Sequence, residues 1–357
     1  MWIWQLVSSW GGTLNKRILW GVGAVLMACC LSLPLVACKG KQDKQADTSS
    51  VESSTDDASK KTIYTTFFPV YDLTKRIVGD KMNVKMIIKG NQEPHDFELK
   101  AKDMAAMSKA DLFVYNGAGM EAFIPDLKKT VGDDSKFLDL SQGLELLEHT
   151  SKPVGDSLQD AGSSNEYEVV KDTTKDTQES EHGNVNPHTW LSIKNAMEEL
   201  DTIYQKLATM DPDNAQYYKD NYAKSLAEFK QLDKKFSDTL SSVAPDKRYF
   251  VASHAAFNYL ARDYGLKQVA VTGISPEDEP TAAQLATISD FVKKHNITTI
   301  FFEGSATPKV AETLARTTGA KTSSLYTMES LTDDEVNMGY LALMEKNLDA
   351  LMESFSE

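Results

Sequence analysis

The stretch Asn214–Ser242 reads NAQYYKDNYAKSLAEFKQLDKKFSDTLSS and decides how the chain is organised. Its apolar side chains recur at the spacing of one helix face, at Tyr217, Tyr222, Leu226, Phe229, Leu232, Phe236 and Leu240. A helix of this length would span about 40 Å, which is enough to brace two domains that lie side by side. An ordinary surface helix of a single domain is the alternative.

Strand-like and helix-like runs alternate on both sides of this helix. Before it, we expect strands at Thr62–Phe67, Val84–Ile88, Asp111–Tyr115 and Phe137–Leu140, and helices at Val70–Val78, Leu99–Ser108 and Met120–Thr130. After it, we expect strands at Arg248–Ser253, Gln268–Thr272, Thr298–Glu303 and Thr322–Thr327, and helices at Ala255–Tyr264, Ala282–Lys294, Lys309–Thr317 and Asp334–Glu353. Strands that alternate with helices imply parallel βα units.

The sequence therefore predicts an α/β protein of two βα sandwich domains with parallel sheets, joined by one long rigid helix. The N-terminal domain would cover residues 61–212, the connecting helix residues 213–243, and the C-terminal domain residues 244–357. Residues 150–184 are acidic, rich in Ser, Thr and Gly, and nearly free of apolar runs. Such a composition cannot build a core, so we expect an acidic loop inserted in the N-terminal domain.

The N-terminus has the features of an export signal. Residues 1–37 contain no acid, carry Lys16 and Arg17, and then run apolar up to Cys38. A cysteine at this point resembles the lipobox of bacterial lipoproteins, so residues 1–37 would be a signal peptide and Cys38 the lipidation site. An uncleaved membrane anchor is the alternative, because about twenty apolar residues can span a bilayer. The polar residues 38–60 would then form a flexible tether that holds the protein outside the cell membrane.

Cysteine content and charge exclude several classes of site and partner. Cys29, Cys30 and Cys38 are the only cysteines, and all lie in this N-terminal segment. The folded part therefore has no disulfide framework and no thiolate metal site, so nitrogen and oxygen atoms must hold any metal. The formal net charge of −14 argues against nucleic acid, whose phosphates demand a basic surface.

Three of the six histidines lie at the end of an apolar run or in a loop stiffened by proline. His254 follows the strand Arg248–Ser253, and His95 lies beyond the strand Val84–Ile88, so both occupy the carboxyl side of a strand, where open α/β sheets bind ligands. His188 follows Pro187, as His95 follows Pro94, and proline restricts the backbone before each ring. Each histidine taken singly is more often structural than metal-binding, but the set points to one metal site.

An acidic side chain would complete this set, because three imidazoles and one carboxylate can fill the coordination shell of a zinc ion. Glu303 and Glu329 both follow strand-like runs in the second half of the chain. We expect Glu329 to be the metal ligand. Glu303 is either the alternative ligand or an acceptor that orients a histidine from behind.

From Thr62 to its C-terminus, the chain resembles the metal-binding solute-binding lipoproteins of bacterial ABC importers, the helical-backbone metal receptor (TroA-like) superfamily. The resemblance is carried by four segments: Pro-His-Asp-Phe-Glu at His95, Asn-Pro-His-Thr-Trp-Leu at His188, Ser-His-Ala-Ala-Phe at His254, and Tyr-Thr-Met-Glu-Ser-Leu at Glu329. It implies two α/β domains joined by one long helix, one metal between them, and delivery to a membrane permease.

The same resemblance bears on which metal is bound. The zinc branch of the family typically uses three histidines and one acid or water, whereas the manganese branch usually replaces the third histidine with a carboxylate. His254 therefore points to Zn²⁺, with Mn²⁺ as the alternative, and imidazole ligands favour zinc on chemical grounds. Many zinc members have a histidine-rich loop at this point, whereas here only His149 and His182 flank the acidic loop. The loop is either a metal-collecting segment of low affinity or an ordinary solvated loop.

The sequence thus predicts a lipid-anchored, monomeric zinc receptor on the extracytoplasmic face of a bacterial cell membrane. It would bind zinc with high affinity, deliver it to an ABC permease for import, and catalyse no reaction. Two other classes remain as alternatives. A surface adhesion protein could use the same fold, and a zinc hydrolase would need an open coordination position and a nearby base. The chain contains neither a His-Glu-x-x-His pair nor a Gly-x-Ser-x-Gly elbow, which argues against the hydrolase.

Overall fold

The first sheet lies in the N-terminal half of the chain. A computed structural model describes residues 60–148, 169–170, 185–303 and 309–356. The strands of this sheet are β1 (Thr62–Thr65), β2 (Asn83–Met86), β3 (Leu112–Tyr115) and β4 (Phe137–Asp139). They pair in the order β2-β1-β3-β4, and every pairing is parallel.

The second sheet repeats this arrangement in the C-terminal half. Its strands are β7 (Tyr249–Ala252), β8 (Lys267–Ala270), β9 (Thr299–Glu303) and β10 (Lys321–Leu325). They pair in parallel in the order β10-β9-β7-β8, so the first strand again lies between the second and the third. The two sheets have the same topology, and all of their strands were expected from the sequence to within a few residues.

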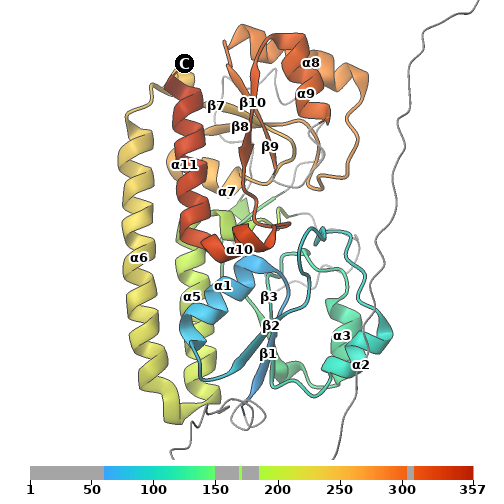
Figure 1. Ribbon diagram of the computed structural model, residues 1–357, viewed down its shortest axis with the longest axis vertical. Coiled ribbons are helices and arrows are strands. Elements are labelled where there is room, and N and C mark those ends of the chain that lie inside the picture. Colours follow the sequence, from blue (N-terminus) through green and yellow to red (C-terminus); the bar gives the residue numbers. More distant parts are fainter. Residues whose placement is uncertain (1–59, 149–168, 171–184, 304–308, 357) are drawn as a thin grey trace, which may run out of the picture. The chain divides into compact units, whose positions relative to one another are not determined.

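Helices cover both sheets and connect them (Figure 1). The helices beside the first sheet are α1 (Phe68–Val78), α2 (Ala101–Met107) and α3 (Ile124–Val131). Those of the second half are α7 (Asn258–Tyr264), α8 (Ala282–Lys294), α9 (Lys309–Thr318), α10 (Asp333–Met338) and α11 (Tyr340–Ser356). Between the halves, α5 (Ile193–Met210) and α6 (Ala215–Ser241) pack against each other. Because α6 contacts both α1 and α11, it braces both halves, and the predicted fold of two parallel-sheet domains and a long helix is confirmed.

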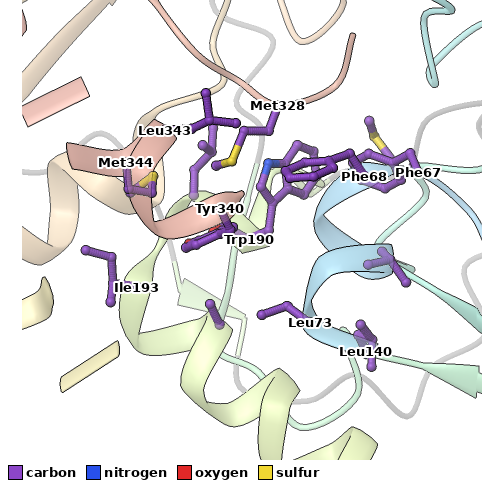
Figure 2. Close-up of a cluster of buried hydrophobic side chains, with 14 of the residues drawn as sticks. Phe67, Phe68, Leu73, Leu140, Trp190, Ile193, Met328, Tyr340, Leu343 and Met344 are labelled. Atoms are coloured by element: carbon purple, nitrogen blue, oxygen red, sulfur yellow. The ribbon is translucent and has the colours of Figure 1, made fainter. Parts of the chain in front are cut away.

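The core passes without interruption from one half to the other. Trp190 is fully buried, and its ring packs edge-on against Phe67 with 4.8 Å between the ring centroids. Figure 2 shows Trp190 among side chains from both halves, including Tyr340 and Met328 of the C-terminal half. The described residues from 60 to 356 accordingly cluster as one compact unit. The domain boundaries at residues 212 and 243 therefore remain a prediction, since contacts cross them freely.

Three sequence expectations need correction. The helix expected at Asp334–Glu353 is split into α10 and α11 at Gly339, whose φ of 83° suits glycine and would strain any other residue. The helix expected from Met120 begins only at Ile124, since a tight turn precedes it. Within the acidic segment, Val169–Val170 pairs antiparallel with β5 (Leu146–Leu147) as β6, so the segment is not wholly irregular.

Several expectations concern residues outside the described part of the chain. These are the signal peptide 1–37, nearly all of the tether 38–60, Cys38, and the acidic loop 150–184 apart from its short strand, with the flanking His149 and His182. Among the residues that the structure describes, no helix is both long and apolar enough to cross a bilayer.

Candidate metal centre

The four side chains expected to form a metal site meet in one buried cluster. His95 lies in the connection from β2 to α2, and His188 directly precedes a single 3-10 turn at residues 189–191. His254 follows the end of β7 by two residues, and Glu329 follows the end of β10 by four. All four side chains are buried, with at most 4% of any residue exposed. The structure thus brings together residues that are far apart in the sequence.

The distances within the cluster are short. The Nε2 atom of His188 lies 3.2 Å from Nε2 of His95 and 3.1 Å from Nε2 of His254. The Oε1 atom of Glu329 lies 3.0 Å from Nε2 of His95 and 2.9 Å from Nε2 of His188. Its other oxygen, Oε2, lies 3.4 Å from Nε2 of His254. Both carboxylate oxygens therefore face imidazole nitrogens.

These spacings are close to those of a tetrahedral shell around one small cation. Ligand atoms about 2.0–2.2 Å from a central zinc ion stand about 3.3–3.6 Å from one another at the corners of a tetrahedron. The five separations given above run from 2.9 to 3.4 Å, slightly shorter than these edges, and one ligand atom of each of the four residues falls within 4.8 Å of all the others. Three nitrogens and a carboxylate are also the donor set that zinc prefers.

The backbone before Glu329 is held in an unusual conformation. Met328 has a φ of 65°, in the left-handed region that residues other than glycine seldom occupy. Its side chain is only 1% exposed and packs in the shared core, which holds the conformation in place. Strain of this kind costs about 1–3 kcal/mol and tends to gather at functional sites. Here it directs the carboxylate of Glu329 into the histidine cluster.

Glu303 lies behind His254 and outside the set of converging atoms. It is the last residue of β9, and its Oε1 accepts a hydrogen bond of 3.2 Å from the backbone N–H of His254. The same oxygen lies 3.3 Å from Nδ1 of His254, an ion-pair contact without hydrogen-bond alignment. This position favours the orienting role for Glu303 over the role of direct ligand.

Burial and mutual attraction shift the pKa values within the cluster. Burial disfavours a charged imidazolium and lowers the pKa of His188 from 6.5 to about 3. Burial opposes charge on His254 as well, but Glu303 and Glu329 outweigh it and raise the pKa of His254 well above its usual value. Burial would also raise the pKa of Glu329, yet His188 and His254 hold it well below its usual range. A buried carboxylate that stays ionised calls for a cation among its neighbours.

A cavity of about 370 Å³ reaches the cluster from one side. His254 and Glu329 form part of its wall, together with five further acidic residues, Glu93, Glu277, Asp278, Glu279 and Glu303. Most of its wall belongs to the C-terminal half, and Asn91 and Glu93 of the N-terminal half also line it. Its carboxylates favour the approach of a cation over that of an anion.

Sequence reasoning assigned no role to two residues next to His188. Asn186 accepts a hydrogen bond of 2.7 Å from Nδ1 of His188, and Trp190 donates from its indole nitrogen to the backbone oxygen of Thr327 at 2.7 Å. Both belong to the segment Asn-Pro-His-Thr-Trp, so the motif itself was the available signal. Their hydrogen-bond partners depend on the fold, and no spacing in the sequence predicts them.

Fold and site together define a two-domain α/β protein with a buried three-histidine, one-carboxylate centre between parallel sheets. The family model for the periplasmic zinc-uptake complex component A, ZnuA, matches residues 63–354. The chain belongs to this family. All four cluster residues fall within the matched region.

Two relatives have similar sequences. The high-affinity zinc uptake system protein ZnuA of Bacillus subtilis is 39% identical over 339 residues, which cover 94% of this chain and 97% of the relative. The zinc-binding lipoprotein AdcA of Streptococcus pneumoniae is 38% identical over 333 residues, 93% of this chain. The match covers only 60% of AdcA, so AdcA is considerably longer than the part it shares with this chain.

Solved structures have the same fold. The Zn(II)-bound ZnuA-like domain of Streptococcus pneumoniae AdcA is 36% identical, with a TM-score of 0.66 over 84% of this chain and 100% of that domain. The laminin-binding protein Lmb of Streptococcus agalactiae, described as a bifunctional protein with adhesin and metal-transporting activity, is 32% identical. Its TM-score is 0.68 over 83% of this chain and 99% of its own.

Proposed function

We propose that the protein is an extracytoplasmic zinc receptor that holds one Zn²⁺ with His95, His188, His254 and Glu329 and hands it to an ABC permease. The observation that carries the proposal is the convergence of four buried donor atoms, all within 4.8 Å of one another. Membership of the zinc-uptake family and the names of the relatives support it. Mn²⁺ is the alternative cargo, but three imidazoles and a single carboxylate favour zinc.

A receptor fits this site better than an enzyme does. A catalytic zinc site usually has three protein ligands and keeps a fourth position open for water or substrate. In this cluster, four side chains surround the common centre and each is buried. We therefore propose that the protein binds and releases zinc without catalysing a reaction.

Location and partner follow from the same proposal. A lipidated Cys38 would anchor the chain to the outer face of the cell membrane, and the permease would receive the metal there. Replacement of Cys38 by alanine tests the anchor. The wild type should incorporate labelled fatty acid, whereas the variant should not. Equal labelling of the two proteins would contradict lipidation at Cys38.

Metal titration tests the proposed ligands. We expect the full chain to bind one zinc ion. Loss of a residue that only orients a metal ligand typically weakens metal binding about 10- to 100-fold, and His254→Ala should weaken zinc binding by more than that. His295→Ala is the matched control, because His295 lies at the end of α8 and packs against Tyr249 and Phe291 instead. Equal zinc affinity in wild type and His254→Ala would overturn the proposed ligand set.

Adhesion is a second candidate function, favoured by the structural likeness to Lmb, which is described as having adhesin activity. It would add to zinc binding and need not replace it. Binding of the purified protein to immobilised laminin, with and without zinc, tests it. Absence of binding in both conditions would remove this candidate and leave the zinc receptor intact.

A further inference from the structure

Asn186 lies two residues before His188, and it is completely buried. Its side chain makes three hydrogen bonds. The amide nitrogen Nδ2 donates to the backbone oxygen of Ala255 at 2.8 Å. The oxygen Oδ1 accepts from the backbone N–H of His188 at 3.0 Å and faces the ring nitrogen Nδ1 of the same histidine at 2.7 Å. Every polar atom of this carboxamide therefore meets a partner in the region around the metal ligands.

The two backbone partners show which end of the Asn186 carboxamide is the NH₂ group and which is the oxygen. A carbonyl oxygen can only accept, so the end that faces Ala255 must be the NH₂ group. A backbone N–H can only donate, so the end that faces His188 must be the oxygen. Because Oδ1 can only accept, Nδ1 of His188 must carry a hydrogen to form the 2.7 Å bond. In a neutral imidazole, the other nitrogen, Nε2, then bears the lone pair.

We infer that Asn186 is a positioning residue for the metal centre, because it locks the proton of His188 on Nδ1 and turns the lone pair of Nε2 towards the cluster. The inference rests on the proposed zinc-receptor function for its purpose, but the proton's position can be measured without metal. A carboxamide does this without adding charge, whereas carboxylates often perform the task in zinc sites.

The locked proton has a consequence for the site. Nε2 of His188 lies 2.9 Å from Oε1 of Glu329. With the proton on Nδ1, Nε2 turns a lone pair, and no N–H group, towards this oxygen. Both atoms then face the centre of the cluster as electron-pair donors, an arrangement that suits a metal ion between them.

Asn186 is itself held firmly in place. Its backbone N–H donates to the carbonyl oxygen of Leu147 at 2.8 Å, and its carbonyl accepts from the hydroxyl of Tyr259 at 2.7 Å. Through Ala255, the residue after His254, its side chain also contacts the segment that carries another ligand. One carboxamide therefore orients the ring of His188 and ties it to the loop of His254.

The position of the proton can be read from nitrogen-15 NMR of the imidazole rings in the metal-free full chain. In the wild type, His188 should carry its proton on Nδ1 and leave Nε2 bare. In Asn186→Ala, the acceptor is lost, and the proton should move to Nε2, from which it can bond Glu329. In Asn186→Asp, an acceptor oxygen is restored, so the proton should return to Nδ1.

A matched control is available in Asn116, another buried asparagine whose Nδ2 donates to the backbone oxygen of Pro187 at 2.8 Å. Asn116→Ala disturbs the same segment without touching the ring of His188, so its tautomer should remain that of the wild type. A shift to Nε2 in Asn116→Ala equal to that in Asn186→Ala would show a general structural effect and overturn the inference.

Zinc titration of the same variants completes the test. Asn186→Ala should bind zinc about 10- to 100-fold more weakly than wild type, the usual cost of losing an outer hydrogen bond to a metal-binding histidine. Asn186→Asp should recover only part of that loss, because its second oxygen faces the carbonyl of Ala255 without a hydrogen to donate. Wild-type affinity and an unchanged tautomer in Asn186→Ala would overturn the inference alone. Failure of the wild type to bind zinc would instead overturn the proposed function, whatever the tautomer.

Discussion

Trp190 donates its indole N–H to the backbone oxygen of Thr327, with 2.7 Å between the two heavy atoms. Trp190 follows His188 by two residues, and Thr327 precedes Glu329 by two. One buried hydrogen bond therefore fastens together the segments that supply two of the four proposed ligands. Since these segments belong to different halves of the chain, the bond also joins the halves beside the site.

Replacement of Trp190 by phenylalanine tests this connection. The change keeps an aromatic ring against Phe67 but leaves the carbonyl of Thr327 buried without its donor, which costs about 1–3 kcal/mol. We expect urea unfolding to show a loss of at least that size, because the smaller ring also leaves a cavity in the core, and zinc titration to show weaker binding. Tyr326→Phe, in the neighbouring position, is the control and should change neither. Unaltered stability in Trp190→Phe would mean that the bond contributes little.

A shared core also predicts that the two halves move little when metal binds. Figure 2 shows Trp190 of the N-terminal half in one cluster with Phe67 of the same half and with Met328 and Tyr340 of the C-terminal half, so a wide opening would expose buried apolar surface. Small-angle scattering of the metal-free and zinc-loaded protein should give nearly equal radii of gyration. A clear contraction on adding zinc would show a hinge motion that this core should prevent.

Most of the fold could be predicted from local patterns. The strands and helices follow from apolar periodicity, and the stripe from Tyr217 to Leu240 identified α6, which the structure places at Ala215–Ser241. The break at Gly339 was missed, because a glycine within a helical pattern is often tolerated and only its φ of 83° reveals the interruption. The β5–β6 pair was also missed, since two-residue strands leave no periodicity to detect.

The histidine cluster could be predicted because each ligand has a local marker, either a preceding proline or the end of a strand. The choice between Glu303 and Glu329 could not be made in this way, since both follow strand-like runs. The structure gives the two carboxylates different surroundings, which favour Glu329 as the proposed ligand. The left-handed backbone at Met328 turns Glu329 inward, whereas Glu303 meets the backbone of His254 from behind.

Amide substitutions compare the two carboxylates directly. Glu329→Gln keeps the shape of the side chain but removes the charge that faces three imidazoles. Changes in residues that only orient a metal ligand weaken binding roughly 10- to 100-fold, so loss of a true ligand should weaken zinc binding by more than about 100-fold. Glu303→Gln, the matched change, should fall within that range. The reverse order would make Glu303 the ligand.

Zinc should stabilise the folded protein, because the ligands come from both halves and converge only in the native state. At a free zinc concentration of about 100 times the Kd, the gain is about 2.7 kcal/mol. Thermal unfolding followed by circular dichroism should show a rise in Tm that a chelator reverses and that His254→Ala lacks. A similar rise in that variant would place the stabilising metal elsewhere on the chain.

The buried carboxyl of Glu199 predicts how stability depends on pH away from the metal ligands. Burial raises the pKa of Glu199 from 4.5 to about 8. The oxygen Oγ1 of Thr189 lies 2.9 Å from Oε1 of Glu199 and 3.0 Å from Oδ1 of Asn116. The single hydroxyl hydrogen of Thr189 cannot be donated to both oxygens at once. A protonated Glu199 can donate to Oγ1 of Thr189 and leave that hydrogen for Asn116, so protonation of Glu199 satisfies all three groups.

The sign of the effect follows from proton binding. Between pH 4.5 and about 8, the folded state holds a proton on Glu199 that the unfolded state has released, so stability falls as the pH rises through this window. Glu199→Gln resembles the protonated form at every pH. The variant should match wild type near pH 4.5 and exceed it by a few kcal/mol, on the order of what the pKa shift implies, at pH 9. Glu198→Gln, an exposed neighbour, should show no such gain in urea unfolding. A difference between Glu199→Gln and wild type that is constant with pH would mean that Glu199 does not titrate in this window.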